Sequence, residues 1–205
     1  MEGVPQPYIL VDRDAIMLSL VNSYGVSSGK QVEFLPRALH GLRSLTQHGY
    51  GVLVLCYEGC AGSDALRPHQ LRQIEHRFRL EIALAGGKIE RLYCCAHKTE
   101  RACHSHRPAL GLALRALGDF GLNASHTHIV TPSEEHLDAA LSAGCPGVLL
   151  RREAFLRSET SLVGSAVVAS DLLEAAEWVV SLAGTQVPRL LEGREPVLPS
   201  FPRMA

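Results

Sequence analysis

The fold is decided by Tyr8-Ile9-Leu10-Val11-Asp12-Arg13-Asp14, a stretch near the start of this 205-residue chain. A short apolar run that ends in an acidic residue is typical of a buried parallel strand. Ligands of open α/β sheets bind beyond the carboxyl ends of such strands. We therefore expect Asp12 and Asp14 to lie in a crevice at the carboxyl edge of a sheet, with Asp12 on the central strand.

Outward from this stretch, apolar runs and helical patterns alternate along the chain. The pattern predicts further strands at 50–55, 89–94, 128–130, 147–150 and 167–168. It predicts helices from Pro36 to the stop at Gly49 and at 70–81, 109–117, 134–143 and 172–182, the last one capped by Ser170 or Asp171. This alternation indicates an α/β fold with a parallel sheet and helices on both faces, which is a three-layer α/β/α architecture.

The composition favours one domain over residues 1–184. The hydrophobic fraction of 46% is enough for a sizeable core. Four prolines, Pro188, Pro196, Pro199 and Pro202, predict a loose tail over 185–205. The formal net charge of -1 provides no field that attracts nucleic acid or an anionic membrane. We find no secretory signal and no apolar run near the ~20 residues that span a bilayer. We expect a cytoplasmic monomer.

Asp12 and Asp14 have a spacing that suits phosphoryl transfer. The first carboxylate can attack phosphorus, and the second can act as general acid and base. A Mg²⁺ ion would bind the first carboxylate together with the phosphate. The alternative is a strand-ending turn with two solvated acids. The spacing alone favours this alternative, but the position at the strand end favours the catalytic interpretation equally.

A second candidate site is the dense Cys/His segment that follows the strand predicted at 89–94. Zn²⁺ takes four nitrogen or sulfur ligands, which short loops supply in close pairs. Cys95 and His97 form one pair, and Cys103 forms the other with His104 or His106. The alternative is a metal-free loop, and we favour zinc. Cys94, beside the first ligand, is expected to point into the core.

These motifs, in this order, resemble the haloacid-dehalogenase (HAD) superfamily. Within it, the chain is similar to the zinc-loop branch of heptose bisphosphate phosphatases and histidinol phosphatases. That branch has Asp-Arg-Asp-Gly-Thr where this chain has Asp-Arg-Asp-Ala-Ile at 12–16. It has Phe-Leu-Pro-Gly-Ala where this chain has Phe-Leu-Pro-Arg-Ala at 34–38, and both place Gly-Tyr before the second strand. The resemblance extends over about residues 8–153.

The resemblance implies a site for a phosphomonoester of carbohydrate metabolism. Asp12 corresponds to the nucleophile and a Mg²⁺ ligand, and Asp14 to the general acid and a second Mg²⁺ ligand. The family's phosphate-binding Thr and Asn fall on Cys56 and Tyr57, and its phosphate-binding Lys falls on Arg107. The zinc ligands implied are Cys95, His97, Cys103 and His106.

The same comparison shows altered motifs. Cys56 replaces a hydroxyl donor with a thiol, and Ser105 replaces a zinc cysteine. The family's late Val-Gly-Asp-x-x-x-Asp motif falls on residues 130–136, so Pro132 replaces a Mg²⁺ ligand and His136 the last Asp. Glu134 or Glu135 is a possible substitute ligand, but helix N-terminal acids facing the helix dipole are the favoured interpretation.

Two hypotheses follow from these matches and departures. The first is a divergent phosphatase that acts on a sugar phosphate through an aspartyl-phosphate intermediate. The second is a catalytically impaired relative that serves as a binding or interaction protein. Because a family fold does not fix function, the site must decide between them. Because Pro132 replaces the acidic ligand, we expect weak Mg²⁺ binding in the absence of substrate and low or absent turnover.

Overall fold

A computed structural model describes residues 6–18, 32–56, 68–94, 110–151 and 166–185 of the chain. Its centre is a six-stranded sheet of order β5-β4-β1-β6-β7-β8, in which every pairing is parallel. The strands are β1 (Tyr8–Asp12), β4 (Gly51–Cys56), β5 (Arg91–Cys94), β6 (His128–Thr131), β7 (Gly147–Leu150) and β8 (Val167–Ala169).

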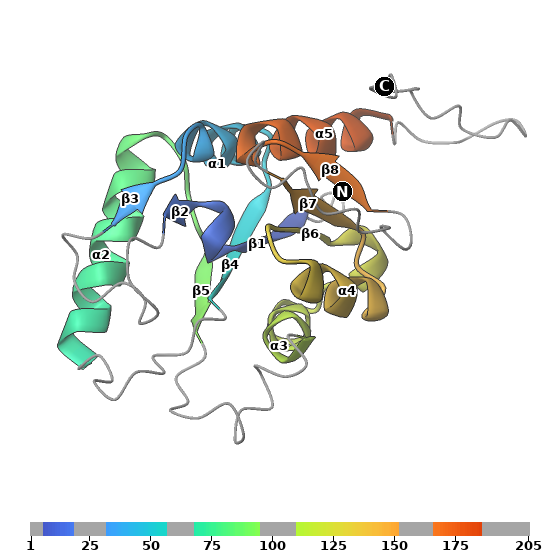
Figure 1. The fold of residues 1–205 in the computed structure, drawn as a ribbon, viewed down its shortest axis with the longest axis horizontal. Helices are drawn as coiled ribbons and strands as arrows, with labels where there is room; N and C mark the ends of the chain where they lie inside the picture. The colour runs from blue at the N-terminus through green and yellow to red at the C-terminus, as the bar shows by residue number, and fades with distance from the viewer. Residues whose placement is uncertain (1–5, 19–31, 57–67, 95–109, 152–165, 186–205) are drawn as a thin grey trace, which may run out of the picture.

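Helices cover both faces of this sheet (Figure 1). One face packs against α1 (Ala38–Gln47), α2 (Pro68–Leu84) and α5 (Leu172–Thr185). The opposite face packs against α3 (Leu110–Phe120) and α4 (Glu134–Ser142). The parallel sheet and the three-layer architecture predicted from the sequence are therefore confirmed.

The first strand, β1, is the structural centre of the molecule. It pairs with β4 on one side and with β6 on the other. Ile9 and Val11 belong to the core cluster on the α1 face, whereas Leu10 belongs to the cluster on the α3 face, and all three are 0% exposed. A strand that is buried on both faces needs a continuous apolar run, which explains the sequence pattern.

Beyond β1 the chain turns sharply into a short 3₁₀ helix, η1 (Arg13–Ala15). It then enters a two-stranded antiparallel ribbon of β2 (Met17–Leu18) and β3 (Glu33–Phe34). A second 3₁₀ turn, η4 (Ala124–His126), precedes β6. The ribbon was not predicted, because two-residue strands carry too little periodicity to be recognised in a sequence.

The predicted boundaries differ from the observed ones by a few residues at most elements. Helix α1 begins at Ala38 rather than Pro36, because Arg37 has a left-handed backbone with φ of 61°. Helix α5 is capped by Asp171, whose Oδ1 accepts the Glu174 amide at 3.0 Å. The predicted tail over 185–205 lies, except for Thr185, outside the described residues.

None of the described helices is both long enough and apolar enough to cross a membrane.

Candidate functional site

Asp12 is the last residue of β1 and is almost completely buried, with 2% exposure. Its backbone remains extended while the next residues enter η1, so Asp12 is the N-cap of that turn. Its Oδ1 accepts the backbone amide of Asp14 at 3.1 Å. Such a cap satisfies an amide that the turn leaves without a partner. The strand end and the turn together fix the position of this carboxylate.

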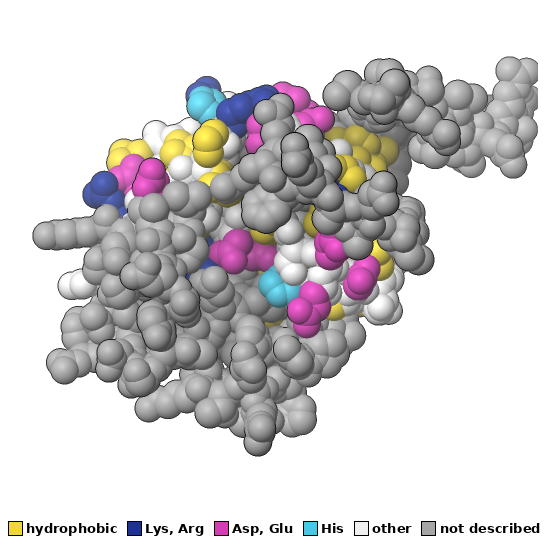
Figure 2. All heavy atoms as spheres, in the orientation of Figure 1, with side chains coloured by type: hydrophobic (Ala, Val, Ile, Leu, Met, Phe, Trp, Pro, Cys, Tyr) yellow, Lys and Arg dark blue, Asp and Glu magenta, His cyan; other side chains and the backbone are white. Residues whose placement is uncertain are grey.

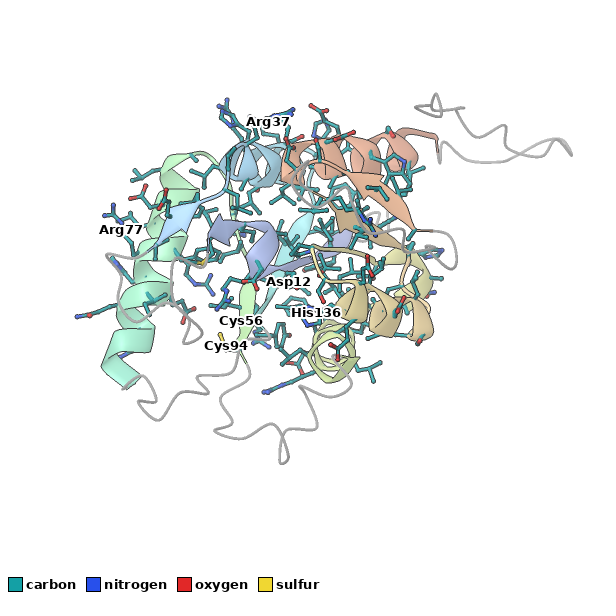
Figure 3. All side chains as sticks on the ribbon, viewed as in Figure 1. Asp12, Arg37, Cys56, Arg77, Cys94 and His136 are labelled. Atoms are coloured by element: carbon teal, nitrogen blue, oxygen red, sulfur yellow. The ribbon has the colours of Figure 1, made fainter. Side chains whose placement is uncertain are left out.

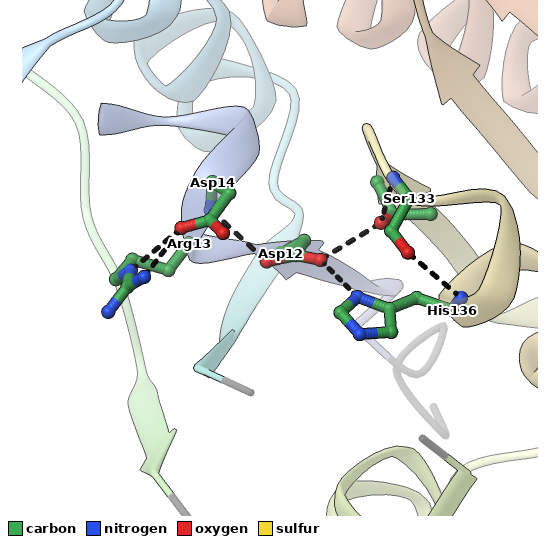
Figure 4. A network of polar contacts seen from close by, with 6 residues as sticks. Asp12, Arg13, Asp14, Ser133 and His136 are labelled. Atoms are coloured by element: carbon green, nitrogen blue, oxygen red, sulfur yellow. Dashed lines mark hydrogen bonds and ion pairs between the residues drawn. The ribbon is translucent and has the colours of Figure 1, made fainter. Parts of the chain in front are cut away.

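The other carboxylate oxygen of Asp12 binds two side chains that come from the neighbouring strand and helix. Thr131, at the end of β6, donates its hydroxyl to Oδ2 at 2.9 Å. His136, in the first turn of α4, places Nδ1 2.7 Å from the same oxygen (Figure 4). A buried carboxylate needs such partners, because desolvation without them is costly. Asp12 is therefore held by three hydrogen bonds from residues of this chain.

The start of α4 brings His136 to this position. Ser133 is the N-cap of the helix, and its hydroxyl accepts the His136 amide at 3.3 Å. The Thr131 hydroxyl in turn accepts the Ser133 amide at 3.1 Å. The end of β6 and the first turn of α4 therefore each contribute one side chain to Asp12, and Ser133 between them caps the helix (Figure 4).

Asp14 forms an ion pair with its neighbour Arg13. Nε and Nη2 of Arg13 donate to Oδ1 of Asp14 at 2.9 and 2.7 Å. The Asp14 side chain is 35% exposed, and the Arg13 side chain 13%. Nη1 of Arg13 contacts Cys56 Sγ at 3.2 Å. A guanidinium with all three nitrogens engaged holds the second carboxylate of the motif beside β4.

Cys56 and Cys94 are neighbours at the ends of β4 and β5. A hydrogen bond joins the two side chains and raises the pKa of Cys56, with burial adding to that shift. The same hydrogen bond lowers the pKa of Cys94. Cys94 is exposed, so the expectation that it points into the core is wrong. Cys94 is the last residue of β5, which is an edge strand of the sheet.

The structure brings three of the predicted site residues close to one another. Asp12, Asp14 and Cys56 lie at the carboxyl ends of β1 and β4, as parallel pairing predicts. Tyr57, Arg107 and the predicted zinc ligands Cys95, His97, Cys103 and His106, with the alternative His104, lie outside the described residues. Within the described part of the chain, no three His, Cys, Asp or Glu side chains are grouped as a metal site.

Three site residues were not selected from the sequence: Arg13, Thr131 and His136. Arg13 is part of the Asp-Arg-Asp motif, and Thr131 and His136 are identified in the sequence only as departures from a family pattern.

The two glutamates at the start of α4, which were possible substitute Mg²⁺ ligands, are not among the described residues that hydrogen-bond to Asp12. Glu134 forms an ion pair with Arg151, and Glu135 is exposed. These positions agree with the interpretation of both as acids of the helix N-terminus.

The donor set around Asp12 does not fit a resident Mg²⁺ ion. Mg²⁺ prefers oxygen ligands in octahedral geometry and is usually held by one or two carboxylates. Here Oδ2 of Asp12 is bound by an imidazole and a hydroxyl, and Asp14 is bound by Arg13. Pro132 offers no side-chain oxygen at the position of the family's acidic ligand. An entering Mg²⁺ ion would have to displace His136.

The face that carries this site has a mixed electrostatic character. Acidic and histidine side chains are visible together near the centre of the face (Figure 2). Figure 3 places Asp12 and His136 at this centre, with Cys56 and Cys94 beside them. The arrangement places an oriented carboxylate, an imidazole, a guanidinium and two thiols near one another.

Comparison with known proteins finds relatives named as heptose bisphosphate phosphatases. No family model matches the chain. A D-glycero-beta-D-manno-heptose-1,7-bisphosphate 7-phosphatase of Neisseria meningitidis is 27% identical over 139 residues, which are 66% of this chain and 72% of the relative. A D-glycero-D-manno-heptose-1,7-bisphosphate 7-phosphatase of Thermosynechococcus vestitus is 22% identical over 194 residues, covering 86% of this chain and 96% of that protein.

Solved structures of phosphatases are similar to this chain in fold. The D,D-heptose 1,7-bisphosphate phosphatase of B. bronchiseptica, complexed with magnesium and phosphate, superimposes with a TM-score of 0.75 at 21% identity. The match covers 86% of this chain and 99% of that one. A HAD-like protein from Mesorhizobium loti gives a TM-score of 0.67 at 17% identity, covering 86% of each chain. The fold of this chain is therefore HAD-like.

Proposed function

We propose that this chain is a phosphatase-type protein of the heptose bisphosphate phosphatase branch that takes a small sugar phosphate at Asp12 and hydrolyses it slowly. The observation that carries the proposal is the placement of Asp12 and Asp14. Asp12 ends the central strand at the carboxyl edge of the sheet, and Asp14 follows on the turn beside it. Ligands of open parallel sheets bind at this edge. The named relatives and the fold support the same substrate class.

The proposed reaction proceeds in two steps. Asp12 attacks phosphorus, the bond from phosphorus to the ester oxygen breaks, and Asp14 donates a proton to the leaving alcohol. Water then attacks phosphorus of the aspartyl phosphate, Asp14 takes a proton from that water, and the bond to Asp12 breaks. Asp12 is regenerated and inorganic phosphate is released. Arg107 is proposed to offset the charge of the phosphoryl group.

Slow turnover is part of the proposal because of the contacts of Asp12. A nucleophilic oxygen that accepts hydrogen bonds from Thr131 and His136 is stabilised in the ground state, and attack must weaken those bonds. The Cys56 thiol, which replaces a hydroxyl donor, is a weak hydrogen-bond donor. Both effects lower the rate without preventing a phosphate from binding.

The second candidate is a non-catalytic protein that binds a phosphorylated metabolite. The specific observation in its favour is again the Asp12–His136 contact of 2.7 Å, which gives the carboxylate a partner inside the protein. In this case Asp12 orients the imidazole and serves as a structural residue. The two candidates share a ligand class and differ in whether Asp12 forms a covalent bond.

The first prediction separates the candidates by phosphate release. The purified chain is incubated with a panel of sugar mono- and bisphosphates, with and without Mg²⁺, beside Asp12→Asn. Asn keeps the size of Asp12 but removes the nucleophilic charge, so hydrolysis should fall to the buffer background. Asp138→Asn, an exposed change on α4, is the matched control and should retain the wild-type rate.

Equal rates for wild type and Asp12→Asn would exclude the phosphatase. Calorimetric titration of the same panel then tests the second candidate, which requires binding by the wild-type chain. A chain that neither binds nor hydrolyses any member of the panel would contradict both candidates.

A further inference from the structure

The ends of β4 and β5 bring two cysteines together beside the candidate site. Cys56 and Cys94 are a register pair of the parallel sheet, so their side chains lie on the same face. Adjacent strands are about 4.8 Å apart, and a disulfide forms between Cα atoms about 4.4–6.8 Å apart. Figure 3 shows the two residues side by side. The backbone spacing is therefore compatible with a covalent bond.

The two side chains of this register pair differ in their access to solvent. Cys56 is buried, with 8% exposure, whereas Cys94 is exposed. The Cys94 sulfur is thus accessible to a dissolved reagent, and the buried Cys56 lies beside it on the neighbouring strand, where it can react with an oxidised Cys94. A buried thiol alone is usually inert.

We propose that Cys56 and Cys94 are a modification site, at which a two-electron oxidant of the peroxide class forms a disulfide. The Cys94 sulfur attacks one peroxide oxygen, the O–O bond breaks, and a sulfenic acid and water result. The Cys56 sulfur then attacks the Cys94 sulfur, the S–O bond breaks, and a second water leaves. In total, two thiols lose two electrons and two protons, and one hydrogen peroxide is reduced to two waters.

The location of the pair connects the modification to the candidate site. Arg13 contacts the Cys56 sulfur through Nη1 at 3.2 Å and binds Asp14 through its two other nitrogens. Asp14 in turn donates its backbone amide to Asp12. A continuous set of polar contacts therefore leads from Cys56, the register partner of Cys94, to the buried Asp12. The inference does not depend on the proposed function, because the bond itself is what the experiment detects.

The second prediction is a Cys56–Cys94 crosslink in the full chain. The reduced protein is freed of reductant, treated with hydrogen peroxide under native conditions, unfolded in iodoacetamide and digested with trypsin. Trypsin leaves Cys60 on the peptide of Cys56, and Cys95 on the peptide of Cys94, so fragmentation of the linked peptides must locate the bond. The expected product is the Cys56–Cys94 pair, which reduction with dithiothreitol removes.

Matched variants give the control. Cys56→Ser and Cys94→Ser should each lose the crosslink, while Cys145→Ser should retain it. Cys145 is buried with 1% exposure, and burial raises its pKa to about 11, so it should be recovered as a reduced thiol. The proposal is overturned if Cys56 is recovered as a free thiol after Cys94 has been oxidised, or if the bond joins a different pair. The wild-type digest decides this even where a variant fails to fold.

Discussion

Thr131 stands where the resemblance predicts a glycine, and its hydroxyl has become a structural partner of Asp12. His136 stands where the last acidic residue of the motif is expected, and its imidazole contacts the same oxygen. The sequence placed both residues near the site by alignment. It did not reveal that they contact Asp12. Thr131 is 119 positions from Asp12 in the sequence and His136 is 124 positions from it, so these contacts depend on the whole fold.

The third prediction concerns the return of a magnesium site. Thr131→Gly with Pro132→Asp supplies the missing carboxylate, and adding His136→Asp removes the imidazole that Mg²⁺ would have to displace. Changes in outer contacts alone alter metal affinity by about 10–100-fold. We expect the triple variant to bind Mg²⁺ at least about tenfold more tightly than wild type. Adding Cys56→Thr should raise any hydrolysis, and Asp12→Asn should abolish it.

Calorimetric titration with MgCl₂ in the absence of substrate measures this affinity. Replacing His136→Asp by His136→Asn in the triple variant is the matched control, since Asn removes the imidazole without adding a carboxylate. Tight binding of Mg²⁺ by wild type would show that the interpretation of Pro132 is wrong. Glu134, released from Arg151, would then be the leading substitute ligand.

Cys94 illustrates a different limit of residue-level reasoning. Its place before the predicted zinc ligand Cys95 suggested a side chain turned into the core. The structure places it on an edge strand instead, which within the described residues pairs with β4 alone, and its side chain is exposed. Strand order decides between these outcomes, and strand order is a long-range property that local sequence does not encode.

At the scale of the helix, the residue before α1 differs from the pattern of the resembled family in its side chain. Arg37 has a φ of 61° at the position where the family has Gly. A left-handed backbone is costly for a residue with a Cβ. Its guanidinium forms an ion pair with Asp171 at the start of α5, at 2.8 Å. The predicted helix start at Pro36 did not anticipate this backbone, since most residues avoid it.

Helices α1 and α5 pack closely at Gly41. A Cβ built on Gly41 would lie 2.6 Å from the Leu172 carbonyl oxygen, which belongs to the backbone and cannot move aside. The fourth prediction is that Gly41→Ala destabilises the fold by about 1–3 kcal/mol, as overpacking does in well-packed cores. The helix propensity of Ala offsets at most about 1 kcal/mol of this. Urea unfolding followed by circular dichroism measures the change.

Gly118 in α3 provides the matched control. A Cβ built there meets no atom within 4 Å. Gly118→Ala should therefore raise the free energy of unfolding by up to about 1 kcal/mol through propensity alone. If both variants shift stability in the same direction, close packing of α1 on α5 at Gly41 is not the controlling factor.

The start of α5 predicts a dependence of stability on pH. The Ser170 hydroxyl and amide both donate to the Glu174 carboxylate, and these hydrogen bonds lower its pKa below 4.5. A carboxyl group with a lowered pKa in the folded state stabilises the fold above its unfolded pKa. That contribution is lost as the pH falls from about 4.5 through the lower folded value.

The fifth prediction is that Glu174→Gln is less stable than wild type at pH 7 and that the difference shrinks below pH 4.5. Thermal unfolding of both proteins across this range measures it. Ser170→Ala removes the hydroxyl donor and should reduce the same pH dependence. A difference that stays constant with pH would mean that the charge of Glu174 does not contribute to the cap.

At the scale of the whole molecule, the alternation of apolar runs and helical patterns was enough to predict the parallel sheet, its two covered faces and the central position of β1. This success has a physical reason, because parallel strands need crossovers and the crossovers need helices. The site was predictable only where it sits on regular elements. Asp12, Asp14 and Cys56 follow from strand ends, whereas the contacts of His136 and Arg13 depend on tertiary packing.

The central position of β1 also sets an order of events during synthesis. Tyr8–Asp12 leaves the ribosome before its two sheet partners, Gly51–Cys56 and His128–Thr131. The contact between Asp12 and His136 closes a loop across 124 positions. Folds with many such distant contacts form slowly, because chain entropy is lost before the contacts stabilise the product. A nascent chain that stops before β6 therefore carries an apolar strand β1 whose β6-facing edge has no hydrogen-bonding partner from that strand.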